Sequence, residues 1–175
     1  VPAGLGSHVH WDRKMDGLLA GALMSIQAVK AVEIGDGAMQ ASQRGSQAHD
    51  AIAIDDSATS SGGFVRRSDH AGGLEGGMTS GAPLIARVSM KPLATLNRPV
   101  LETVDVATGE STVSFKERTD VTAVPALGVI TEAMMALVVA NEALRKFGGD
   151  SVAEFVRNAD AYLSHLGETP SRARP

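Results

Sequence analysis

Arg118 and Asp120 lie two residues apart, immediately before an apolar segment whose first turn holds Pro125. Proline lacks the backbone N–H that a first helical turn leaves unpaired, so the pattern predicts a helix that begins near Val124. Asp120 would then lie close to the positive end of that helix, which favours an ionised carboxylate. Such a carboxylate can cap the helix or accept a proton, and a neighbouring guanidinium can bind phosphate through two hydrogen bonds. The local sequence leaves both roles for Asp120 open.

A lysine and a glycine-rich segment are two further candidate ligand sites. Lys91 follows an expected strand, and Pro92 forces an extended exit that directs the ammonium and the Thr95 hydroxyl. These groups would suit a phosphate, although a lysine at a strand end is more often simply solvated. The stretch SDHAGGLEGGMTSG contains five glycines and matches neither the Walker nor the dinucleotide-binding pattern. It is either a ligand-binding loop or an irregular turn.

The composition limits the classes of function. The chain has 175 residues, of which 43% are hydrophobic, enough for one domain with its own core. The absence of cysteine excludes thiol nucleophiles and disulfides and favours a reducing compartment. A net charge of −4 with one Trp and one Tyr argues against a nucleic-acid surface. The longest uninterrupted apolar run, residues 133–140, is too short to span a membrane, so we expect a cytoplasmic protein.

The histidines do not form the pattern of a metal site. His8 and His10 are the only closely spaced pair, and neither His49 nor His70 belongs to a matching second pair. The sequence therefore predicts no metal. The opening VPAGLGSHVHWD reads as the middle of a protein rather than as a translation start.

Three helices are expected to position the candidate residues. Apolar residues at helical spacing predict the first from Asp12 to Lys30, which would place Gln27 and Ala28 inside it. The second is predicted from Pro125 to about Phe147, before two glycines that allow a left-handed cap. A capping box of Ser and Glu predicts the third up to Leu166. We expect a disordered tail at residues 167–175.

Strands are predicted in three places. VEIG and PLIARVSMK each favour one strand, the second half-buried because its apolar and polar residues alternate. ETVDVATGESTVSFKE predicts two strands around Thr108-Gly109, in which Val104 and Val106 are matched by Val113 and Phe115. The polar passage from residue 36 to 69 is too long for a simple connector and is expected to be a functional or mobile loop.

Five pieces of the chain, in this order, resemble chorismate synthase: SIQAVKAVEIGDG, HAGGLEGGMTSG, VSMKPLAT, RTDVTAVPALGVITEAM and KFGGDS. The resemblance extends from Gly4 to about Leu166 and is closest to actinobacterial members. It implies an α/β fold, the β-α-β sandwich of that family, of which residues 1–166 would be the C-terminal half. The other half of the family's chain carries two catalytic histidines and several substrate-binding arginines.

The resemblance also implies an activity. Chorismate synthases use reduced FMN to eliminate phosphate and a proton from 5-enolpyruvylshikimate 3-phosphate, giving chorismate without net redox change. They are lyases of the shikimate pathway and of aromatic amino acid biosynthesis. The implied assembly is a homotetramer, with NADPH as a source of electrons for the flavin. A non-catalytic flavin- or phosphate-binding module, or an assembly fragment, is the alternative.

The family's site residues can be placed on this sequence. The resemblance implies catalytic roles for Asp120, as a proton shuttle, and for Arg118, as fixed positive charge. The implied FMN contacts are Gln27, Ala28, Gly76, Lys91, Pro92, Leu93, Ala94, Thr95 and Arg118.

Three positions depart from the family pattern: Thr119 replaces Ser or His, Ala31 replaces Gly, and Asp69 replaces Asn. Asp69 adds negative charge near a phosphate-rich site and would be unfavourable unless Arg66 or Arg67 pairs with it.

Overall fold

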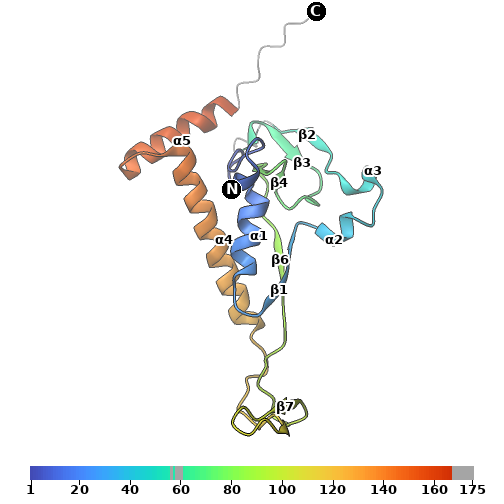
Figure 1. The fold of residues 1–175 in the computed structure, drawn as a ribbon. Helices are drawn as coiled ribbons and strands as arrows, with labels where there is room; N and C mark the ends of the chain where they lie inside the picture. The colour runs from blue at the N-terminus through green and yellow to red at the C-terminus, as the bar shows by residue number, and fades with distance from the viewer. Residues whose placement is uncertain (56, 58–60, 167–175) are drawn as a thin grey trace, which may run out of the picture.

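The computed structural model describes residues 1–55, 57 and 61–166, so the predicted tail at 167–175 lies outside the described residues. Two helices, α1 and α4, run antiparallel side by side, and a strand pair lies along α1 (Figure 1). The predicted mixture of helices and strands is confirmed, and all strand pairs in the described residues are antiparallel. The elements are η1 (Trp11–Arg13), α1 (Met15–Met24), β1 (Val29–Ile34), α2 (Gly37–Gln40), α3 (Gly45–Ala48), β2 (Ile52–Ile54), β3 (Phe64–Arg66), β4 (Leu74–Glu75), β5 (Met78–Thr79), β6 (Ala86–Met90), β7 (Glu102–Val104), β8 (Ser111–Val113), α4 (Val124–Phe147) and α5 (Val152–Leu166).

The core lies where the N-terminal segment, α1 and the C-terminal end of α4 meet. Leu5, Met15 and Leu19 are fully buried and pack with Leu74 and Phe147. Burying these side chains contributes roughly 1.5–3 kcal/mol each, which orients α1 against α4. The core therefore fixes the two helices relative to each other.

The buried carboxylate of Glu142 joins the N-terminal segment to α4 and pairs with Arg145 on the same helix. Glu142 is 4% exposed. Its two carboxylate oxygens share the Nε–H of Arg145, at 2.9 and 2.8 Å, and Oε1 also accepts the Gly6 N–H at 3.1 Å. Lys146 donates to the Gly4 carbonyl at 2.6 Å. A buried carboxylate needs such partners, because an unpaired one would be costly to desolvate.

The rest of α4 exposes apolar surface. Val129, Ile130, Leu137 and Leu144 are all exposed in the described chain. By length and composition alone, α4 is long and apolar enough to cross a membrane. Core helices of soluble proteins pass the same test. An exposed apolar stripe of this kind is typical of a surface that another element covers.

The first helix ends earlier than the sequence predicts. It stops at Met24, and Ser25 closes it through a side-chain hydrogen bond to the Ala22 carbonyl at 2.7 Å. Val29 and Lys30 belong to β1 instead, where they pair with β6. The prediction of a helix to Lys30 was wrong because the pairing of β1 with β6 satisfies the backbone groups that a longer helix would have used.

The two C-terminal helices were predicted correctly. α4 begins at Val124 and ends at Phe147, and the following Gly148 has a positive φ of 60°. Half of the predicted capping box is present: the Glu154 N–H donates to Ser151 Oγ at 3.3 Å, while the Glu154 carboxylate accepts the N–H of Asp150, at 2.7 Å, rather than that of Ser151. Local signals sufficed because helix ends are set by residues within one turn.

The β7–β8 hairpin exists, but its register is different from the predicted one. Val104 pairs with Ser111, and Val113 pairs with Glu102. The Asp105 carboxylate accepts the Ala107 N–H at 2.8 Å, so the turn begins at Asp105 and takes Val106 out of the strand.

The passage 36–69 is more structured than the sequence predicts, since it contains α2, α3 and the β2–β3 pair.

Candidate functional site

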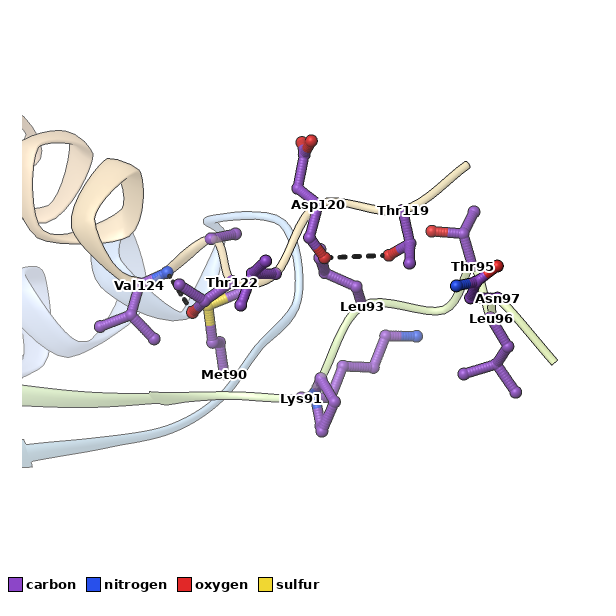
Figure 2. A pocket seen from close by; sticks show the side chains of 13 residues that line it. Met90, Lys91, Leu93, Thr95, Leu96, Asn97, Thr119, Asp120, Thr122 and Val124 are labelled. Atoms are coloured by element: carbon purple, nitrogen blue, oxygen red, sulfur yellow. Dashed lines mark hydrogen bonds between the residues drawn. The ribbon is translucent and has the colours of Figure 1, made fainter. Parts of the chain in front are cut away.

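A pocket of about 430 Å³ lies where β6 ends and α4 begins (Figure 2). One wall is residues 90–93 and 95–97, and the other is residues 119–124. The predicted site residues Lys91, Pro92, Leu93, Thr95 and Asp120 are all in these walls. Two segments separated by residues 98–118, which contain the β7–β8 strand pair, are thus brought together by the tertiary structure.

The Gln27-Ala28 turn lies directly beside this pocket. The Lys91 N–H donates to the Ala28 carbonyl at 2.9 Å, which extends the β1–β6 ladder into the turn. Gln27 lines an adjoining hollow of about 370 Å³ that shares Met90 and Ala123 with the first pocket. The predicted FMN-contacting pair is therefore next to the predicted lysine, although in a turn rather than in a helix.

Ala28 adopts an unusual backbone conformation. Its φ is +69°, the only positive value at a non-glycine among the described residues. An alanine in this region costs about 1–2 kcal/mol, so the surrounding contacts must hold it there. Such strained positions are concentrated at ligand sites, which makes the turn a candidate part of the site.

The Lys91 side chain offers a free positive charge. Figure 2 shows it extending along its own wall of the pocket, toward Leu96 and Asn97. Among the described residues none forms an ion pair with its ammonium. An exposed ammonium in a pocket that threonine residues also line is suited to bind a phosphate.

Asp120 does not cap α4. The cap position is Ala123, and the Val124 N–H donates to Thr122 Oγ1 at 3.2 Å (Figure 2). Asp120 Oδ1 instead accepts from Arg118 Nη2 at 3.1 Å, with side chains 72% and 90% exposed. Of the two roles that the sequence left open for Asp120, capping is excluded.

The pocket also contains residues that the sequence reasoning missed. Asn97 and Thr122 line it with polar side chains, and Thr119 donates its hydroxyl to the Asp120 carbonyl at 3.1 Å. Thr122 could have been found as a hydroxyl residue just before a helix start, a position that such residues favour. Asn97 lies in an irregular segment and gave no sequence signal.

Besides Gln27 and Ala28, three predicted residues lie outside the pocket wall. Ala94 and Arg118 are neighbours of residues in the wall but do not line it. Gly76 lies in the turn between β4 and β5, where the adjacent Gly77 carbonyl accepts the N–H of Met15 at the start of α1. The pocket is beyond the other end of α1, a helix of 10 residues that is about 15 Å long. The structure does not bring Gly76 to Lys91, and its role as an FMN contact stays a prediction.

The glycine-rich segment has a clear packing role. A Cβ on Gly72 would come within 2.5 Å of the Gly35 backbone, and one on Gly73 within 2.3 Å of the Pro83 carbonyl. Both have positive φ. The glycines allow the segment to pack closely against the ends of β1 and β6.

The structure also shows the surroundings of two departures from the family pattern, Asp69 and Ala31, and leaves Asp69 Oδ2 buried without a hydrogen-bond partner among the described residues. Arg66 pairs with Glu75 at 2.5 Å, so the expectation that Arg66 or Arg67 neutralises Asp69 was wrong. Asp69 Oδ1 instead accepts the Gly73 N–H at 2.7 Å, which keeps it within the turn. Ala31 is exposed on β1, so its methyl group has room.

The described residues contain no group of three or more His, Asp or Glu side chains that could hold a metal ion.

Comparisons with known proteins give the family. A family profile described as chorismate synthase matches residues 1–144. The chorismate synthase of Thermobifida fusca (strain YX) is 58% identical over 166 residues, covering 95% of this chain and 41% of the relative. That of Leifsonia xyli subsp. xyli is 52% identical over 174 residues, covering 99% of this chain and 42% of the relative.

A solved chorismate synthase structure has the same fold. It matches with a TM-score of 0.76 at 40% identity, covering 97% of this chain and 41% of the solved chain. The chain therefore spans about two-fifths of the length of the relatives it matches. The profile match and the shared fold together show that this chain belongs to the chorismate synthase family.

Proposed function

We propose that this chain supplies part of the active site of a chorismate synthase, a carbon-oxygen lyase that acts on a phosphate ester. The reaction would be the elimination of phosphate and a proton from 5-enolpyruvylshikimate 3-phosphate with reduced FMN. The observation that carries the proposal is the hydrogen bond from Lys91 to Ala28. It joins the Gln27-Ala28 turn to one wall of a pocket whose other wall contains Asp120, so residues from three separate motifs lie at or beside one pocket.

The residues present fit FMN by their chemistry. The Lys91 ammonium and the hydroxyls of Thr95 and Thr119 suit the phosphate, while Met90 and Ile130 offer apolar surface in the adjoining hollow. Together the two hollows are in the size range of cofactor sites. Reduced FMN, when bound, supplies an electron-rich flavin that the reaction does not consume overall.

Arg118 and Asp120 would act on the substrate. The Arg118 guanidinium can bind two oxygens of the departing phosphate, where negative charge develops. An ionised Asp120 can accept a proton if the substrate brings it within reach. Their high exposure leaves both side chains accessible to a ligand.

The remaining features of the family are proposals of the same kind. We infer a homotetramer, a flavin reduced with electrons from NADPH, and a cytoplasmic location without nucleic-acid or membrane binding. The absence of cysteine supports the cytoplasmic location, and the net charge of −4 supports the absence of nucleic-acid binding.

A chimera tests the proposed function. Residues 1–166 would replace the aligned segment of the T. fusca chorismate synthase, to which they are 58% identical. We expect the chimera to bind FMN and to form chorismate, while the 175-residue chain alone forms none because it lacks the family's histidine-bearing segment. A folded chimera that fails to bind FMN would refute the proposal. FMN binding without chorismate formation would favour the non-catalytic binding module.

A further inference from the structure

A cluster of charged side chains outside the pocket holds the glycine-rich segment to the β1–β6 pair. His70 Nδ1 lies 2.8 Å from Asp36 Oδ2, and because an ionised carboxylate has no proton to donate, the imidazole is the donor. The other oxygen of Asp36 pairs with Arg87 Nη2 at 3.1 Å. Asp36 follows β1, Arg87 is on β6 and His70 begins the glycine-rich segment, so three elements meet at one carboxylate.

A second carboxylate, that of Asp50, binds the same segment through three hydrogen bonds. Asp50 Oδ1 accepts the His70 N–H at 2.9 Å and the Ser68 hydroxyl at 2.6 Å, and Asp50 Oδ2 accepts the Ala71 N–H at 2.9 Å. Because Gly72 and Gly73 have no side chains, the adjoining segment depends on backbone bonds and on this cluster for its position.

We propose that His70 is a pH-sensitive clamp, which fastens the glycine-rich segment to β1 and β6 while its imidazole is protonated and loosens that attachment when it is neutral. The His70 side chain is 30% exposed, so its proton can exchange with solvent. A neutral imidazole can still donate from Nδ1, so deprotonation weakens the bond to Asp36 rather than removing it. This inference does not rest on the proposed function.

The charges around His70 give the direction of the effect. The hydrogen bond to Asp36 raises the pKa of His70 above its ordinary value, and the negative charges of Asp50 and Asp69 act in the same direction. Partial burial opposes them. Two cations face this cluster: Arg87 pairs with Asp36, and Arg66, which pairs with Glu75, also interacts electrostatically with Asp50. Because the folded-state pKa is raised, the clamp is fully present below the unfolded-state pKa and is lost as the pH rises through the folded-state pKa.

The first test follows the imidazole itself. The five histidines are titrated by NMR in the 175-residue chain, and His70 is assigned by comparison with His70→Gln. We expect His70 to titrate above the ordinary value in the wild type and to move toward it in Asp36→Asn. A wild-type His70 that titrates at the ordinary value overturns the proposal.

The second test measures the attachment. Amide protection factors of residues 70–73 are compared below and above the measured His70 transition, with correction for intrinsic exchange. We expect protection to fall about fivefold to tenfold in the wild type, the difference between a charge-assisted and a neutral hydrogen bond. His70→Gln should show low protection at both pH values.

A matched control variant is His49→Gln, which changes an exposed histidine next to Asp50. It should keep the wild-type pH dependence, because His49 takes no part in the clamp. Protection that does not depend on pH in the wild type, or that falls equally in wild type and His70→Gln, overturns the proposal.

Discussion

The Lys91 N–H donates to the carbonyl of Ala28 at 2.9 Å, and this bond joins the end of β6 to a strained turn before β1. It places the side chains of Gln27 and Lys91 on adjoining hollows that meet at Met90 and Ala123. The geometry of the candidate site therefore depends on the register of the β1–β6 pair, and a change in that register would separate the two motifs.

Lys91→Ala in the chimera should weaken FMN binding about tenfold or more with little change in melting temperature. The exposed lysine contributes little to the fold, whereas a charge-assisted contact to phosphate is worth about 1.5–3 kcal/mol. Flavin fluorescence titration and thermal unfolding are measured on the same preparation. Lys30→Ala, an exposed lysine on β1 outside the pocket wall, is the control and should bind FMN as the parent does. Unchanged affinity in Lys91→Ala would return this residue to a simple solvated lysine.

Asp120→Asn in the chimera should lower turnover about 10²–10⁴-fold while FMN stays bound, because an amide cannot accept the proton. The structure sharpens the expectation for stability. Asp120 is exposed and does not cap α4, so the change should cost less than about 0.5 kcal/mol. Near-normal turnover would show that the carboxylate has no catalytic role.

Ala28→Val should destabilise the chain by about 2 kcal/mol or more, because a β-branched side chain strongly disfavours a positive φ. Ala28→Gly should be neutral or slightly stabilising, since glycine adopts this conformation without strain. Urea unfolding gives both values. Ala31→Val, at an exposed position on β1, is the control and should be tolerated. Equal stability of the Ala28 variants would mean that this turn is not held in the left-handed region.

Glu142→Gln should destabilise the fold by about 1–3 kcal/mol near pH 7, because it removes the negative charge that pairs with Arg145. The hydrogen bond from Arg145 lowers the pKa of Glu142, and the Gly6 N–H acts in the same direction. The stability difference between wild type and variant is therefore fully present above the unfolded-state pKa of about 4.5 and shrinks as the pH falls through the folded-state pKa.

Thermal unfolding between pH 7 and pH 3 measures this difference. Glu132→Gln, an exposed glutamate on the same helix, should show little difference at any pH. A Glu142→Gln difference that stays constant down to pH 3 would contradict the assignment of the stabilisation to the ionised carboxylate.

The sequence alone was sufficient where the signal is local. Pro125 and the glycines after Phe147 predicted the bounds of α4, and Ser151 with Glu154 predicted the start of α5, because each helix end is decided by residues within about one turn. The ordered motifs also identified the family, because this identification needs only the residue types and their order along the chain. It does not need the positions of the residues in space.

Only the tertiary structure decided the features that depend on distant partners. The first helix ends at Met24 because β1 pairs with β6, and no residue near Lys30 carries that information. Arg66 pairs with Glu75 rather than Asp69, and His70 meets Asp36 across 34 residues of sequence. Such contacts depend on which distant segments the fold brings together. The entropy lost in closing the intervening chain is offset by tertiary packing, which a local sequence pattern does not describe.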